Sequence, residues 1–173
     1  MIHHHNIQDT RIQKLNDYDI RIDSDYVLYW MQQSQRAEYN HALEYAVLKA
    51  NDLGLGVVVA FGLTDDYPEA NLRHYTFMME GLMETKALLE KRGINMVVSR
   101  GSPPDAALEL GQDAALIVCD QGYLRHQRIW RDQVAWKSAC SVVQVESDVI
   151  VPLETVSSKA EYAARTIRPK IQK

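Results

Sequence analysis

The stretch DYVLYWMQQSQRAEYN, residues 25–40, decides the fold of this chain. Its apolar run from Tyr26 to Trp30 is long enough for a β-strand that is buried on both faces. The polar residues that follow, 32–36, crowd at the carboxyl end of that strand. In an open α/β sheet, ligands bind at this edge. The stretch therefore predicts a strand, a polar elbow and a helix, with a binding site beside the elbow.

Four further apolar runs recur along the chain, and segments with helical periodicity separate them. The runs are residues 56–61, 94–99, 115–120 and 141–145. Because each run is continuous rather than alternating, we expect parallel strands with helices on both faces. The first helix is predicted to carry Tyr39, Leu43, Ala46 and Ala50 on one apolar stripe.

These elements predict a doubly wound α/β fold with a five-stranded parallel sheet. The predicted domain covers residues 23–153. Residues 1–22, which include His3, His4 and His5, are predicted to form a flexible amino-terminal arm.

Composition limits the class of protein. The chain has 173 residues and a net charge of −4, with a pI near 5.8, whereas a free-standing nucleic-acid binder is expected to have a pI above about 9. No apolar run of about 18 residues and no leader pattern is found, so the chain is predicted to be cytoplasmic, with no membrane contact. Cys119 and Cys140 each lie beside an apolar run and are expected to be reduced, buried thiols.

Motifs for common enzyme chemistry are missing. The sequence LGLG at residues 53–56 precedes a strand instead of following one, so it predicts a turn and not a dinucleotide site. Walker A, Gly-x-Ser-x-Gly, Cys-x-x-Cys and His-Glu-x-x-His patterns are not found. Asp65 and Asp66 are adjacent carboxylates, but neighbours in a loop usually point apart, so no metal site is predicted.

Four other stretches carry a resemblance to a known family. They are FGLTDDYPEANLRHY (61–75), RGSPPDAAL (100–108), DQGYLRHQRIWR (120–131) and EYAARTIRPKI (161–171). Together with residues 25–40, they closely resemble the amino-terminal domain of class II cyclobutane pyrimidine dimer photolyases. The resemblance runs in family order over nearly the whole chain. The large helical domain that binds FAD and the DNA lesion in that family is not expected in these 173 residues.

The resemblance implies the strand order 3-2-1-4-5, with a topological switch point between the first and fourth strands. Residues 31–36 and 121–125 meet there, with residues 61–66 and 100–102 beside them. Their flat and polar groups suit a planar, partly polar ligand. The predicted cofactor-binding residues are Trp30, Met31, Gln32, Phe61, Gly62, Arg100, Gly101, Asp120, Gly122 and Tyr123. No catalytic residue is predicted.

Several of these residues also have a simpler explanation. Trp30 and Phe61 lie at strand ends, where core positions are common. The glycines are typical of turns that need positive φ. Asp120 is alternatively a cap for the backbone of residues 121–123.

The resemblance also implies a division of labour. In the family, the helical domain holds reduced FAD and splits the flipped-out dimer by light-driven electron transfer. The amino-terminal domain braces it and can carry an antenna chromophore, a deazaflavin or a folate. FAD is therefore expected only in the missing domain, damaged DNA only as a ligand of the whole enzyme, and the chain alone is expected to be inactive.

A contact surface for the helical domain is predicted on the fourth helix and the tail. The predicted contacts are Arg125, Arg128, Trp130 and Trp136, since arginines and aromatic residues are frequent interface anchors. The two arginines are alternatively solvated or paired with acidic neighbours. Residues 154–173 are predicted to form the interdomain connection, and exposure of this surface is expected to favour self-association.

Two other classes of function remain open from the sequence. One is a stand-alone nucleotide-binding or stress-protein-like α/β module, because the same topology serves adenine-nucleotide binders. Against it, residues 31–36 contain no glycine for a phosphate loop. The other is a structural docking domain with an empty pocket.

Overall fold

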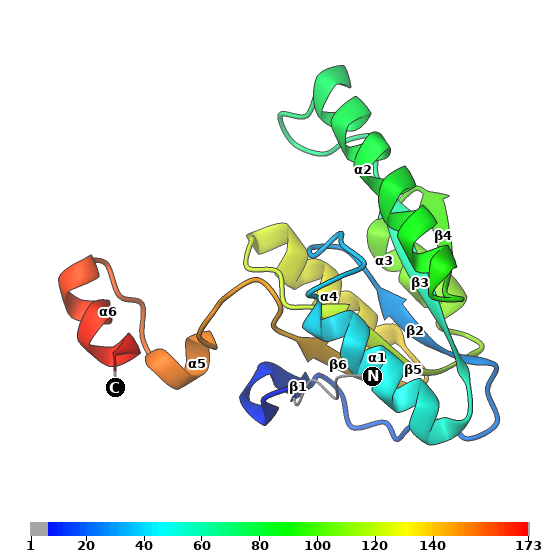
Figure 1. The fold of residues 1–173 in the computed structure, drawn as a ribbon, viewed down its shortest axis with the longest axis horizontal. Helices are drawn as coiled ribbons and strands as arrows, with labels where there is room; N and C mark the ends of the chain where they lie inside the picture. Colours follow the sequence, from blue (N-terminus) through cyan, green and yellow to red (C-terminus); the bar gives the residue numbers. More distant parts are fainter. Residues whose placement is uncertain (1–6, 173) are drawn as a thin grey trace.

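The computed structural model describes residues 7–172, so His3, His4 and His5 of the predicted arm lie outside it. Six strands form one sheet: β1 (Ile12–Lys14), β2 (Tyr26–Trp30), β3 (Gly56–Leu63), β4 (Asn95–Arg100), β5 (Ala114–Asp120) and β6 (Ser141–Val145). Their order across the sheet is β1-β6-β5-β2-β3-β4 (Figure 1).

The predicted five-stranded parallel sheet needs one correction. β1 pairs antiparallel with β6, with Ile12 opposite Val145. The sheet is therefore mixed and six-stranded, and the order 3-2-1-4-5 does not match it in full. The five parallel strands do follow one another in that order, as β4-β3-β2-β5-β6. β1 has only three residues and contains no apolar run, so the sequence pattern did not reveal it. Such a short strand depends on its partner strand for stability.

Helices cover both faces of the sheet. α1 (His41–Leu53) and α2 (Leu72–Lys91) pack on one face, in a core that includes Tyr29 and Val118. α3 (Pro103–Leu110) and α4 (Arg125–Lys137) pack on the other, in a core that includes Trp30 and Ile117. Successive residues of β2 and β5 thus point into different cores, which explains their continuous apolar sequences.

Capping residues set the ends of α1. The Asn40 side chain accepts a hydrogen bond from the backbone N–H of Leu43, and Gly54 ends the helix with a left-handed φ of 69°. Tyr39, predicted on the apolar stripe of this helix, lies before the cap instead. It has a φ of 51° and is 89% exposed. Because Tyr39 precedes the helix, it does not lie on the helix face that packs against the core, so this part of the helix prediction was wrong.

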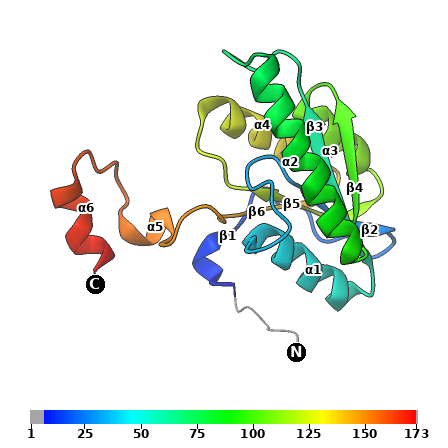
Figure 2. The same cartoon turned by 45° about the horizontal axis from the view of Figure 1, so that its top comes forward.

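The carboxyl-terminal segment extends away from the sheet. It contains α5 (Leu153–Val156) and α6 (Ala164–Ile171), which lie to one side of the domain in both views (Figures 1 and 2). Arg11, the last residue of the 3-10 helix η1 (Asp9–Arg11), fixes the point where this segment leaves the domain. Its guanidinium donates hydrogen bonds to the carbonyl oxygens of Val149 at 2.8 Å and Ile150 at 2.7 Å.

Cys119 and Cys140 are free and buried, which confirms the prediction of reduced thiols. Burial raises the pKa of Cys119 to about 12, so it stays a thiol at neutral pH. Within residues 7–172, no helix has the length and apolar character needed to cross a membrane.

Candidate functional site

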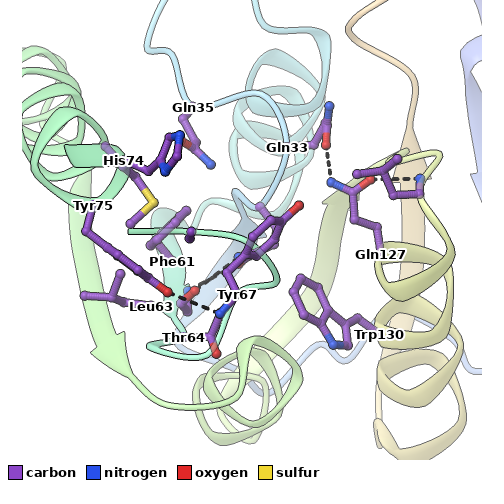
Figure 3. Close-up of a pocket in the computed structure, with 15 residues that line it drawn as sticks. Gln33, Gln35, Phe61, Leu63, Thr64, Tyr67, His74, Tyr75, Gln127 and Trp130 are labelled. Atoms are coloured by element: carbon purple, nitrogen blue, oxygen red, sulfur yellow. Dashed lines mark hydrogen bonds between the residues drawn. The ribbon is translucent and has the colours of Figure 1, made fainter. Parts of the chain in front are cut away.

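A cavity of about 430 Å³ opens at the carboxyl ends of β2 and β3, between the first halves of α2 and α4 (Figure 3). Its volume lies in the range of small-molecule sites in proteins. Two kinds of side chain dominate its wall. Flat rings come from Phe61, Tyr67, Tyr75 and Trp130, and amides come from Gln32, Gln33, Gln35 and Gln127.

Two of the four amides are engaged with the protein on both sides. Gln32 donates to the Gly62 carbonyl at 3.1 Å, and its oxygen accepts from the Trp30 indole at 3.0 Å. Gln127 donates to the side-chain oxygen of Gln33 and accepts from the backbone N–H of Leu124 at 3.1 Å. These two side chains therefore hold neighbouring parts of the cavity wall in place.

The other two amides keep groups for a ligand. Within the described residues, the side-chain nitrogen of Gln33 donates no hydrogen bond, and the side chain of Gln35 makes none. Both line the cavity, where Figure 3 places them above the aromatic rings. They can pair with the edge of a planar ligand whose faces lie against the rings.

Asp120 builds the elbow that carries these amides. One of its carboxylate oxygens accepts the backbone N–H groups of Gln32, Gln33 and Ser34, at 3.1, 2.8 and 2.9 Å. Its other oxygen accepts the hydroxyl of Tyr29 at 2.8 Å. Burial raises the pKa of Asp120, and the hydrogen bonds from the elbow backbone oppose that rise. Asp120 is thus a loop cap, but for residues 32–34 rather than 121–123.

Asn40 closes the same elbow from the helix side. Its amide nitrogen donates to the Tyr29 hydroxyl and the Ser34 carbonyl, each at 2.9 Å. Because Asn40 is also the N-cap of α1, the strand, the elbow and the helix share one hydrogen-bond network. The amides of the elbow therefore sit on a rigid support.

Three of the ten predicted cofactor-binding residues line the cavity: Gln32, Phe61 and Gly62. Trp30 and Met31 are 1% and 0% exposed and belong to the core. Asp120 faces the elbow, as described above.

The other four predicted residues lie outside the cavity. Arg100 pairs with Asp65 at 2.6 Å, and Gly101 has a φ of 135° in the turn after β4. Gly122 accepts a hydrogen bond from Arg131, and the Tyr123 hydroxyl donates to Glu146 at 2.8 Å. Residues 121–123, just after β5, thus lie outside the cavity, whereas the next residue, Leu124, lines it.

The residues missed from the sequence come mainly from the helices and the loop before α2. Tyr67, His74, Tyr75, Gln127 and Trp130 line the cavity because the first turns of α2 and α4 reach its edges. The periodicity of the helices could not reveal this, since Tyr75 fits an apolar stripe equally well. The polar run after β2 did point to Gln33 and Gln35.

The aspartates considered for a metal have protein partners. Asp65 is paired with Arg100, and Asp66 accepts from the hydroxyl of Thr64. Across residues 7–172, no group of three or more His, Cys, Asp or Glu side chains is arranged to hold a metal ion.

Solved structures of low sequence identity share the fold. A universal stress protein in complex with cAMP superposes with a TM-score of 0.50 at 18% identity, over 72% of this chain and 100% of that one. A functionally unknown protein from Pseudomonas aeruginosa gives a TM-score of 0.52 at 12% identity, over 74% of this chain and 50% of that one. Both identities are low, so these likenesses concern the architecture alone.

Relatives of known name are more similar in sequence. The deoxyribodipyrimidine photo-lyase of Methanothermobacter thermautotrophicus is 50% identical over 163 residues, which are 94% of this chain and 37% of that protein. The photo-lyase of Potorous tridactylus is 36% identical, over 90% of this chain and 30% of that protein. The chain therefore spans about a third of the length of these relatives. The family model for DNA photolyase matches residues 27–173, and the chain belongs to the DNA photolyase family.

Proposed function

We propose that this chain is the amino-terminal domain of a class II cyclobutane pyrimidine dimer photolyase and that its cavity holds an antenna chromophore. The family match and the photo-lyase relatives support the first part. The class rests on the resemblance of the stretches described above. The cavity supports the second part.

The observation that carries the proposal is the chemistry of the cavity wall. Aromatic rings and neutral amides surround the space, and no Asp, Glu, Lys or Arg side chain of the described residues lines it. Such a wall favours a planar ligand with an uncharged, hydrogen-bonding edge. The ring system of a deazaflavin fits this description. A folate carries carboxylates, for which this wall offers no guanidinium or ammonium group, so we place it second.

The nucleotide-binding alternative fits the elbow less well. Phosphate sites of this topology use free backbone N–H groups after a strand. Here the N–H groups of Gln32, Gln33 and Ser34 are already bound to Asp120. A phosphate at this elbow would have to displace a carboxylate and would be repelled by it.

Catalysis and lesion binding belong, in this proposal, to the FAD-binding helical domain. Trp136 is 82% exposed on α4 and suits a contact with that domain. Arg125 and Arg128 are exposed on the same helix. Trp130, by contrast, lines the cavity, so we assign it to the chromophore as well as to the contact surface. Residues 154–173 would form the connection.

Binding titrations test the proposal, followed by absorption above 350 nm for the pigments and by calorimetry for ATP, which does not absorb there. A deazaflavin, a folate, FAD and ATP are added in turn to the purified chain. Ala70→Trp should fill the cavity and weaken deazaflavin binding at least tenfold, because Ala70 lines it. Gly81→Trp is the control, since Gly81 is exposed on α2 and a Cβ atom added there meets nothing within 4 Å.

The outcome of the titration decides between an antenna site, a nucleotide-binding module and a docking domain. An antenna site is supported if the deazaflavin binds and if Ala70→Trp weakens this binding while Gly81→Trp does not. Binding of ATP in preference to the pigments supports the nucleotide-binding module. No binding of any ligand, with the fold verified by circular dichroism, leaves a docking domain with an empty pocket.

A further inference from the structure

The loop between β3 and α2, residues 64–71, crosses the edge of the cavity; we call it the strap. Thr64, Tyr67 and Ala70 of the strap line the cavity. On its own side the strap is held by the ion pair of Asp65 with Arg100 of β4 at 2.6 Å and by short-range contacts. The N–H of Tyr67 donates to the hydroxyl of Tyr75 at 3.2 Å, and the N–H of Ala70 donates to the carbonyl of Tyr67 at 3.1 Å.

A contact reaches from the strap across to α4. The hydroxyl of Tyr67 lies 3.1 Å from the Nε2 atom of His126, and the two rings meet edge-on with centroids 5.1 Å apart. His126 in turn packs against Trp130, with ring centroids 4.9 Å apart. In the described part of the chain, no other hydrogen bond, ion pair or ring contact joins the strap to α4.

We propose that the strap is a gate over the cavity and that Tyr67 and His126 are its latch. This inference rests on the proposed function, because it assumes that the cavity takes a ligand. Figure 3 shows Tyr67 between the α2 wall, with His74 and Tyr75, and the α4 wall, with Gln127 and Trp130. Because Tyr67 lines the cavity and reaches across to α4, breaking its contact with His126 would free the strap to move away from that side of the cavity.

The latch is weak enough to open. A single hydrogen bond near the surface contributes a factor of about two to ten to the balance between the closed and open strap. The strap can therefore open often on the timescale of loop motion and still be closed most of the time. Closure over a bound chromophore would keep water and solutes from its faces.

His126 gives a sharp test because it does not line the cavity. His126→Phe keeps a ring against Tyr67 and Trp130 but loses the hydrogen bond. Tyr67→Phe loses the same bond from the other side. In each variant, association and dissociation of the deazaflavin should both accelerate by about twofold to tenfold. The equilibrium constant should change much less, and the double variant should behave like either single one.

The same variants report on the latch without any ligand. Hydrogen exchange at the amides of Tyr67 and Ala70 should accelerate in the free chain by a similar factor. Tyr162→Phe is the matched control, because Tyr162 is 88% exposed and lies on the tail. Exchange in that variant should equal that of the unmodified chain.

The two readouts separate the gate from the binding site. If hydrogen exchange in the strap accelerates but no pigment binds, the latch is supported and the proposed function is refuted. If dissociation alone accelerates, Tyr67 is an ordinary ligand contact and the gate is refuted. Unchanged exchange in both variants also refutes it, whatever the pigment does.

Discussion

Asp120 shapes the candidate site although it does not touch the cavity. Its carboxylate accepts three backbone N–H groups of the elbow and the hydroxyl of Tyr29. Asp120 is only 4% exposed, so this acceptor lies inside the protein and not at its surface. The residue that the sequence marked as a ligand contact therefore acts through Gln33 and Gln35, which the elbow carries.

Replacing Asp120 should destabilise the domain strongly. Asp120→Ala leaves several buried donors without an acceptor, and we expect a loss of about 3 kcal/mol in the free energy of unfolding. Urea denaturation followed by circular dichroism measures it. Asp65→Ala is the control, because its exposed ion pair with Arg100 should leave the midpoint unchanged. Equal midpoints for the two variants would remove Asp120 from its structural role.

Among the elements, the parallel strands and the helices between them could be predicted from the sequence. β2, β3, β4, β5 and β6 are continuous apolar runs because both of their faces are covered, and Gly54 and Gly93 have the positive φ values of helix ends. β1 and α5 were not predictable in this way. Each is too short to have a period, and its conformation depends on neighbours distant in the sequence.

The candidate site was predictable only in part, for a related reason. The carboxyl edge of the sheet follows from the topology, which placed Gln32, Phe61 and Gly62 correctly near the cavity. Which side chains point inward depends on where α2 and α4 begin and how they tilt. Gly122 and Tyr123 lie at the same edge, yet Tyr123 turns to Glu146 instead. No periodicity carries that information.

The carboxylate of Glu161 ties α6 to the segment before it, so the anchoring of α6 should depend on pH. Glu161 accepts from Lys170 at 2.6 Å and from the hydroxyl of Ser157 at 2.9 Å. The hydrogen bond from Lys170 is the main reason that the pKa of Glu161 falls to about 2, below the usual value near 4.3. Because the folded pKa is lowered, the stabilisation is present above the ordinary pKa and is lost as pH falls toward 2.

Amide chemical shifts of α6 should therefore move toward coil values between pH 4.5 and pH 2. Glu161→Gln should produce the same shifts at pH 6. Glu154→Gln, on the neighbouring α5, serves as the control, and signals from α1 report whether the domain itself stays folded. An α6 that is insensitive to both acid and Glu161→Gln would show that other contacts hold it.

At the scale of the whole molecule, the chain corresponds to about a third of its photo-lyase relatives. The sheet and its cavity form the body, and α5 and α6 extend to one side (Figure 1). This arrangement suits a domain that presents a chromophore and a connecting segment to a neighbour. The hollows around Trp136, Arg11 and Gln144 have fewer aromatic side chains in their walls than this cavity.

The isolated chain should therefore not repair thymine dimers. Dimer cleavage needs reduced FAD and a flipped-out lesion, and both are assigned to the helical domain. Irradiated oligonucleotides are incubated with the chain, FAD and a chemical reductant under blue light, and dimer loss is compared with a dark control. A complete photolyase provides the positive control. Light-dependent repair by the chain alone would overturn the division of labour.

The central claim is that the cavity between α2 and α4 binds a planar, uncharged chromophore edge through Gln33 and Gln35. Nuclear magnetic resonance of the glutamine side-chain amides tests it most directly. Saturation with a deazaflavin should shift the amide signals of Gln33 and Gln35, and leave those of Gln13 and Gln144, which bond to each other near β1, unchanged. Unshifted Gln33 and Gln35 signals at saturation, or equal shifts of Gln13 and Gln144, would contradict the claim.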